Sequence, residues 1–295
     1  MPEDNPAPVV VAVGHDPVDS ALAYAVVEAR RRGCGVHLVH AVHHTHDGPD
    51  SVFVTESDRE RVGRLALTSA MERLEAVADE GMTISSDMVS GSIAAAIATS
   101  CADARMIVLE HRDLGRLQRV VTRSVASGVA ARAQVPVVSV PSHWSPSHRH
   151  AAETTVTVGV DDPARSASLL RTAADAASVG GATLCIVHAW AMPRAYEDLG
   201  TSPEDEERWA AQVTTGIQEV LDAIADELEG VTVKIVVRHA PPADALVETS
   251  RTSDLLVIGR HDPLLPVGSH LGPVARAVLR EAECPVMMAG SRQEA

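Results

Sequence analysis

The sequence predicts an α/β protein built from two repeated, doubly wound domains, each with a five-stranded parallel sheet. Three observations support this prediction. Apolar runs of strand length alternate with helical segments, a pattern typical of parallel sheets covered by helices. The same order of segments occurs twice within 295 residues. Apolar residues make up 45% of the chain, which is sufficient for two cores.

The first copy begins with the apolar run 9–13, which is expected to be a buried strand. Ser57 and Glu60 have the spacing of a capping box, so a helix is expected to start there. Gly33 and Gly81 are interpreted as glycines that end two helices. The expected order is strand 9–13, helix 19–33, strand 36–42, helix 57–81, strand 83–89, helix 92–101, strand 106–109, a polar loop, a helix to residue 133 and strand 137–140.

A polar segment punctuated by prolines separates the copies. We therefore expect a first domain at 1–141, a linker at 142–154 and a second domain at 155–295. Ser202 followed by Pro203 predicts a capped helix start. The second copy is expected to contain strand 156–160, strand 184–189, a helix from Ser202 towards Gly230, strand 231–237, strand 255–258, a second polar loop and strand 286–289.

Matching positions in the two copies have nearly constant separations. His15 lies 146 positions before Asp161, and Glu110 lies 149 positions before Gly259. Because only small insertions separate the copies, we infer the duplication of one domain. Strands that alternate with helices imply right-handed crossovers within each parallel sheet.

Composition argues against several classes of protein. A net charge of −15 with a single lysine, Lys234, does not suit a nucleic-acid surface. The four cysteines have no metal-binding spacing, so reduced, buried thiols are expected. The acidic N-terminus has no apolar core, and no apolar run reaches membrane-spanning length. We therefore expect a cytoplasmic protein that binds neither membrane nor nucleic acid.

Each copy also contains a strand followed by a polar loop and a helix start. Glu110 to Arg123 spans thirteen positions in the first copy, and Gly259 to Gly272 spans thirteen in the second. Free backbone N–H groups and the helix dipole converge where a helix begins after a strand. Such a segment can hold an anion.

This frame resembles the nucleotide-binding loop of the universal stress protein family, G-x2-G-x9-G-(S/T). The second copy keeps Gly259 and Gly272 but has Asp262 at the middle glycine and Pro273 at the serine. A carboxylate at Asp262 repels phosphate, and Pro273 has no N–H to donate. The resemblance implies an adenine nucleotide α hydrolase-like fold, with ATP or another adenine nucleotide as the ligand of an impaired second site.

The first copy departs further from the family frame. Glu110, Asp113 and Arg123 stand at its three glycine positions, and only Ser124 is kept. Arg123 matches phosphate in charge but is too bulky for the backbone to approach a ligand closely. The first site is therefore expected to be lost.

The resemblance places the ligand between the first and fourth strands of a domain, with an acid after the first strand facing adenine. Asp161 keeps that place, although an acid ahead of Pro163 is also typical of a turn. The ligand-binding candidates of the second domain are Asp161, Asp162, Ala189, Gly259, Arg260, Asp262, Gly272, Pro273 and Val274. Their degenerate counterparts in the first domain are His15, Arg112, Asp113, Arg123 and Ser124.

No catalytic set and no metal site is predicted. His43, His44 and His46 share a loop and are interpreted as solvated side chains, because no cysteine or repeated carboxylate accompanies them. Ser124 and Ser127 have no His–Asp partners at a recognisable position.

The first functional hypothesis is a tandem universal stress protein that acts as a cytoplasmic regulatory or adaptor module for an unknown protein partner. The alternative is an ATP-binding switch that uses the second domain, with slow hydrolysis. A third hypothesis is an enzyme on the related fold, but no convergent catalytic residues support it. The resemblance also implies that the two domains pair as an intramolecular pseudo-dimer, with a homodimer of such chains as a further assembly.

Overall fold

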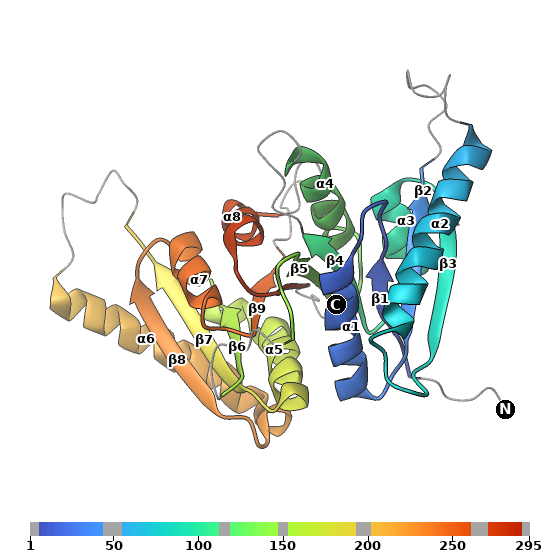
Figure 1. Cartoon of the computed structure of the whole chain (residues 1–295). Helices are drawn as coiled ribbons and strands as arrows, with labels where there is room; N and C mark the ends of the chain where they lie inside the picture. The colour runs from blue at the N-terminus through green and yellow to red at the C-terminus, as the bar shows by residue number, and fades with distance from the viewer. Residues whose placement is uncertain are drawn as a thin grey trace. The chain divides into compact units, whose positions relative to one another are not determined.

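The computed structural model describes residues 6–43, 55–111, 119–146, 153–192, 202–260 and 271–290, with the backbone alone at 119–124. The chain divides into two compact units, residues 1–148 and 149–295. Each unit is described by itself below, as the first and the second domain (Figure 1).

The first domain has a parallel sheet with strand order β3-β2-β1-β4-β5. Helix α1 packs beside α2, and α3 packs beside α4. The elements are β1 (Val9–Ala12), α1 (Asp19–Arg32), β2 (Val36–Val42), α2 (Glu56–Glu75), β3 (Ile84–Ser90), α3 (Ile93–Ser100), β4 (Met106–His111), α4 (Arg119–Ala130) and β5 (Val137–Pro141).

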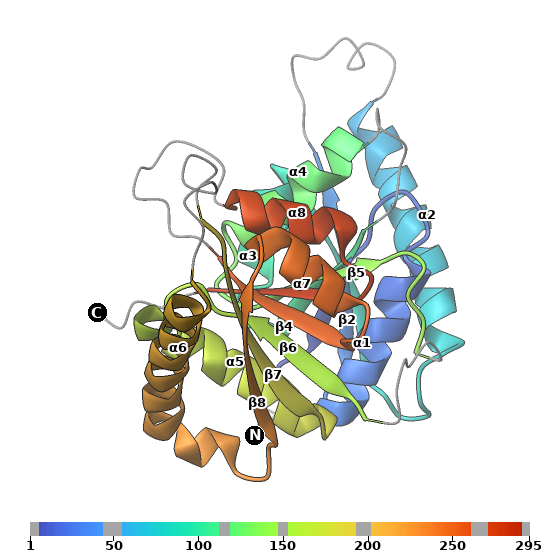
Figure 2. The ribbon, with the colours of Figure 1, turned by 90° about the vertical axis from the view of Figure 1, so that its left-hand side faces the viewer.

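The second domain repeats this topology with strand order β8-β7-β6-β9-β10. Helix α6 lies along β8, as Figure 2 shows, and α7 packs beside α8. The elements are β6 (Thr155–Gly159), η2 (Pro163–Arg165), α5 (Ala167–Gly180), β7 (Thr183–Trp190), α6 (Pro203–Ala223), η4 (Ala225–Leu228), β8 (Val233–His239), α7 (Pro242–Ser250), β9 (Leu255–Gly259), α8 (Pro273–Glu281) and β10 (Val286–Ala289). The predicted fold class is confirmed.

The central strands form the core of each domain. All four residues of β1 are buried, and so are the first four residues of β9. Because successive side chains of a strand point to opposite faces, this pattern means that both faces of the sheet are covered. The strands are continuous apolar runs because helices cover both faces of the sheet, which buries the side chains on either face of a central strand.

The two first helices show the repeat in backbone detail. Helices α1 and α5 each have 14 residues. Gly33 ends α1 with φ 60° and ψ 37°, and Gly181 ends α5 with φ 60° and ψ 38°. Each glycine N–H donates back into the last turn of its helix. This left-handed conformation strongly favours glycine.

Several helix ends differ from the sequence-based expectation. The capping box of α2 is formed by Thr55 and Asp58, not by Ser57 and Glu60. Both pairs have suitable chemistry, but the chain enters the helix two residues earlier. Helix α2 ends at Glu75, before the expected Gly81. By contrast, Ser202 caps α6 as predicted, and its side chain accepts from the Asp205 N–H.

None of the described helices is both long and apolar enough to cross a membrane. All four cysteines are free thiols, and Cys34, Cys101 and Cys284 are buried. Burial raises the pKa of the Cys284 thiol to about 12, so this sulfur stays protonated near neutral pH. Three of the four cysteines are thus buried free thiols as expected, whereas Cys185 is half-buried.

Alanine at either helix-ending glycine should destabilise its domain. Gly33→Ala and Gly181→Ala place a Cβ in a left-handed conformation, which costs roughly 1–2 kcal/mol of unfolding free energy. Chemical denaturation measures the loss. Gly14→Ala is the control, because its Cβ meets no atom within 4 Å and its φ is not positive. Equal losses of unfolding free energy in all three variants would contradict the left-handed conformation assigned to Gly33 and Gly181.

Candidate functional site

The candidate site lies at the carboxyl ends of three neighbouring strands in the second domain. Strand β6 pairs with β7 on one side and with β9 on the other. The chain leaves β6 for β7 in one direction and later returns to β9 in the other, so strand order reverses between β6 and β9. In open α/β sheets this reversal is where ligands bind, outside the carboxyl ends of the strands.

Two aspartates follow β6, and they have different roles. The Asp162 Oδ1 accepts from the Ala164 N–H at 3.0 Å and caps the short helix η2. Asp161 is exposed, and within the described parts of the chain no side-chain or backbone donor bonds to its carboxylate. The turn-forming role considered for Asp161 therefore belongs to Asp162, and Asp161 is free to meet a ligand.

The end of β9 and the start of α8 form the other side of the site. Gly259 is exposed at the end of β9, and Gly272 is the N-cap residue of α8 with Pro273 at its first position. The Arg276 N–H bonds to the Gly272 carbonyl, so Val274 and Ala275 carry the first-turn amides that a ligand could use. Pro273 contributes none. Asp262 lies outside the described residues.

Arg260 and Ala189 complete the set of candidates in this domain. The Arg260 N–H donates to the Ala289 carbonyl at 2.8 Å, which ties the end of β9 to β10. The guanidinium of Arg260 lies against Gly290, where an added Cβ would come within 2.9 Å of Nη2. Ala189, near the end of β7, is half-buried. The backbone fold thus brings the described candidates to one edge of the sheet.

A buried histidine supports the end of the first strand in each domain. The His188 Nδ1 lies 3.0 Å from the Val160 carbonyl oxygen, and the His40 Nδ1 lies 2.9 Å from that of Val13. Both rings are at least 95% buried. A carbonyl accepts, so Nδ1 is the donor in each pair. These histidines position the residues that precede Asp161 and Gly14.

Sequence reasoning missed this role, although a signal was present. The triplets Val39-His40-Ala41 and Val187-His188-Ala189 match between the copies. A histidine retained at the same place in both halves, beside the end of a buried strand, indicates a shared structural partner. The sequence could not show that this partner is a backbone carbonyl on the neighbouring strand.

In the first domain the described candidates are His15 and the backbone of Arg123 and Ser124, and they are placed differently from their counterparts in the second domain. His15 is exposed, and its ring packs edge-on against His40 with 5.4 Å between ring centroids. Helix α4 begins at Arg119, so Arg123 and Ser124 lie inside the helix. The expectation that the helix starts at this pair is wrong, and the Ser124 N–H is not a free first-turn donor. Arg112 and Asp113 lie outside the described residues.

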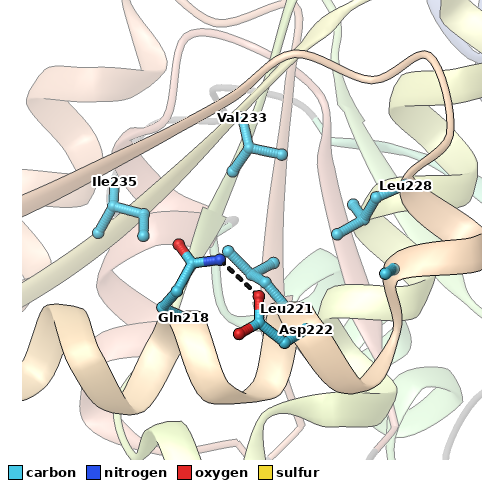
Figure 3. A pocket seen from close by; sticks show the side chains of 7 residues that line it. Gln218, Leu221, Asp222, Leu228, Val233 and Ile235 are labelled. Atoms are coloured by element: carbon cyan, nitrogen blue, oxygen red, sulfur yellow. Dashed lines mark hydrogen bonds between the residues drawn. The ribbon is translucent and has the colours of Figure 1, made fainter.

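A cavity of about 270 Å³ lies beside the amino-terminal half of β8, away from the carboxyl ends of the strands where the candidate site lies (Figure 3). It is bounded by α6, η4 and the first half of β8, and it contains the hydrogen bond from Gln218 Nε2 to Asp222 Oδ1 at 2.8 Å. The remaining lining residues are apolar: Leu221, Ala225, Leu228, Val233 and Ile235. The described residues contain no cluster of three metal-ligating side chains.

The model of the universal stress protein family matches residues 7–141 and again residues 154–290. The chain belongs to the universal stress protein family. It is similar to Universal stress protein Rv2005c of Mycobacterium tuberculosis, with 30% identity over 92% of each chain. Universal stress protein Rv1996 of the same organism is 28% identical, covering 97% of this chain and 96% of its own. These relatives match over both domains, so this is the tandem form of the family.

A solved structure supports the same fold. The crystal structure of a universal stress protein from Archaeoglobus fulgidus matches with a TM-score of 0.69 at 15% identity. The match covers 96% of this chain and 98% of the other. At this identity the likeness concerns the fold alone, and it agrees with the repeated α/β architecture.

The first domain of this universal stress protein should lose stability in mild acid through His40. Burial lowers the pKa of His40 below its ordinary value of 6.5, the Val13 hydrogen bond opposes this shift, and His15 adds to it. The unfolded chain therefore takes up a proton that the folded domain resists. This stabilisation is complete above pH 6.5 and is lost as pH falls below that value.

Urea denaturation at a series of pH values measures this effect. His40→Gln should flatten the dependence of unfolding free energy on pH, because it removes the titrating ring. His37→Gln is the matched control, since His37 lies on the same strand but is only half-buried. Equal flattening by both variants would refute the assignment to His40.

Proposed function

We propose that this tandem universal stress protein is a regulatory or adaptor module. Its second domain retains a weakened adenine-nucleotide site, and its first domain has lost the site. One contrast carries the proposal. The second domain presents Gly259, Gly272 and an exposed Asp161 at the reversal of strand order, whereas the first domain places the Glu110 carboxylate at the equivalent strand end.

The weakness of the second site follows from two replacements. Pro273 removes one N–H at the start of α8, where phosphate oxygens would accept. Asp262 adds a negative charge to the same loop. Each lost hydrogen bond to a charged group costs about 1.5–3 kcal/mol. Together these changes favour weak binding over the tight binding expected of an intact loop.

The alternative function is an ATP-dependent switch that hydrolyses its ligand slowly. The exposed Asp161 and the first-turn amides of Val274 and Ala275, which have no acceptor within the helix, favour this reading over a complete loss of binding. Mass spectrometry of the natively purified protein separates the two. Bound adenine nucleotide supports the switch, and an empty protein supports the adaptor.

Restoring the family frame should raise ATP affinity. The double variant Asp262→Gly with Pro273→Ser removes the repulsive carboxylate and returns a donor and a hydroxyl. We expect an affinity about ten- to a hundredfold higher by titration calorimetry, which corresponds to one recovered charged hydrogen bond. Asp113→Gly in the first copy is the control and should not change affinity. Sub-micromolar binding by the unmodified protein, or no gain in the double variant, would overturn the proposal.

We also infer that the two domains pair within one chain, which satisfies the domain dimer implied by the family resemblance. Strand β5 ends the sheet order of the first domain and β10 that of the second; β5 contains three valines, and β10 contains one valine and two methionines. Apolar edge strands tend to pair with another strand. They are therefore the proposed contact.

Cutting the linker tests this pairing. A protease site placed after Pro146 should yield two halves that still co-elute and scatter light as one particle at dilute concentration. Separation of the halves after cleavage would refute the pairing. The uncut chain, measured at the same concentrations, reports whether a homodimer of tandem chains also forms.

A further inference from the structure

The side chain of Glu110 reaches the start of a helix in the first domain. Its Oε2 accepts from the Ser20 N–H at 2.9 Å and from the Ala21 N–H at 3.3 Å. Helix α1 receives no side-chain cap from its own N-cap residue, Val18. A carboxylate from β4, 90 positions further along the chain, therefore supplies the negative charge that the helix N-terminus favours.

A second contact fixes the same helix start. The Ser20 Oγ lies 2.9 Å from the carbonyl oxygens of both Ser142 and Trp144, and its single proton is shared between them. The Trp144 ring packs edge-on against Tyr24 of α1, with 5.4 Å between ring centroids. The acid of the first turn, Asp19, is directed elsewhere and pairs with Arg73 of α2 at 2.7 Å. Glu110, and not Asp19, is thus the carboxylate that accepts from the first amides of α1.

The second domain has the same framework without the carboxylate. Gly259 corresponds to Glu110, and Ser168 corresponds to Ser20, because the Ser168 Oγ donates to the Gly290 carbonyl after the last strand. The N-cap residue Ser166 provides no side-chain cap to α5, and its Oγ donates to the Pro163 carbonyl at 2.7 Å. A Cβ on Gly259 would lie 3.7 Å from Leu169 Cδ2, so a side chain fits there.

We propose that Glu110 is an intramolecular ligand that takes the place of an external anion in the first domain. Its carboxylate accepts from two of the amides that start α1, those of Ser20 and Ala21, and repels phosphate that approaches the same strand end. The first domain has Glu110 at the position where the second domain has Gly259. This difference then determines which domain can accept an anionic group there. The last step rests on the nucleotide site proposed for the second domain, whereas the occupation of α1 by Glu110 does not.

The contact between the Glu110 carboxylate and the start of α1 can be tested without nucleotide. Trp144 is the sole tryptophan of the first domain, because the other two, Trp190 and Trp209, lie in the second. In a Trp190→Phe, Trp209→Phe background, Trp144 fluorescence reports unfolding next to the Ser20 contact. The full-length chain is compared with Glu110→Ala and Glu110→Gln, in sodium phosphate and in sodium chloride of equal ionic strength.

Glu110→Ala should raise the unfolding constant of the first domain about ten- to a hundredfold, as expected for lost charge-assisted hydrogen bonds. Glu110→Gln should have a smaller effect, because its amide oxygen can still accept. Phosphate should recover part of the loss in Glu110→Ala and should leave the parent protein unchanged. An equal phosphate response in the two proteins, or no loss in Glu110→Ala, would overturn the proposal.

If Glu110→Ala does not fold, adding a carboxylate at Gly259 in the second domain tests the same role of the carboxylate. Gly259→Glu should lower the unfolding constant of that domain relative to Gly259→Ala and should abolish its stabilisation by phosphate. Gly259→Ala is the matched control, because it adds the Cβ without the carboxylate. Identical behaviour of the two variants would refute the role of the carboxylate. Failure of the parent chain to bind ATP would instead count against the nucleotide site and leave the Glu110 result standing.

Discussion

The start of each helix beside a strand end is the constraint on which this structure depends. A doubly wound sheet brings helix N-termini to the carboxyl edge of its strands, and the first amides of each helix have no partner within the helix. These amides need an anion, a capping side chain or a ligand. The first domain satisfies α1 with Glu110, whereas the second domain leaves the start of α5 uncapped by its own N-cap residue beside Gly259.

The two domains therefore show how duplication allows one copy to change its chemistry while the fold is kept. Topology, the helix-ending glycines and the buried histidine contact are the same in both halves. The differences are concentrated at the strand ends. Asp161 corresponds to His15 and Gly259 corresponds to Glu110, so charge and space at the ligand edge differ although the supporting strands do not.

The paired histidines explain why the edge can vary without loss of the sheet. The Nδ1–H of His40 donates to the Val13 carbonyl and that of His188 to the Val160 carbonyl, just before the loop that carries His15 or Asp161. This bond is buried and its acceptor is a backbone carbonyl, so it forms in both domains although His15 follows the strand in one and Asp161 in the other. A buried, satisfied polar contact of this kind is costly to lose, which favours its retention in both copies.

The sequence by itself determined the duplicated α/β architecture, the strand boundaries to within two residues and the family, because periodicity and motif spacing are local properties of the chain. It also located Ser202 as the cap of α6. It predicted Ser57 as the cap of α2, which is wrong: Thr55 has an equally suitable neighbour in Asp58, and the path of the chain into the helix selects that pair. Only the structure showed where α4 starts. The roles of His40 and His188 and the contact of Glu110 with α1 depend on residues brought together from up to 90 positions apart, which local pattern does not encode.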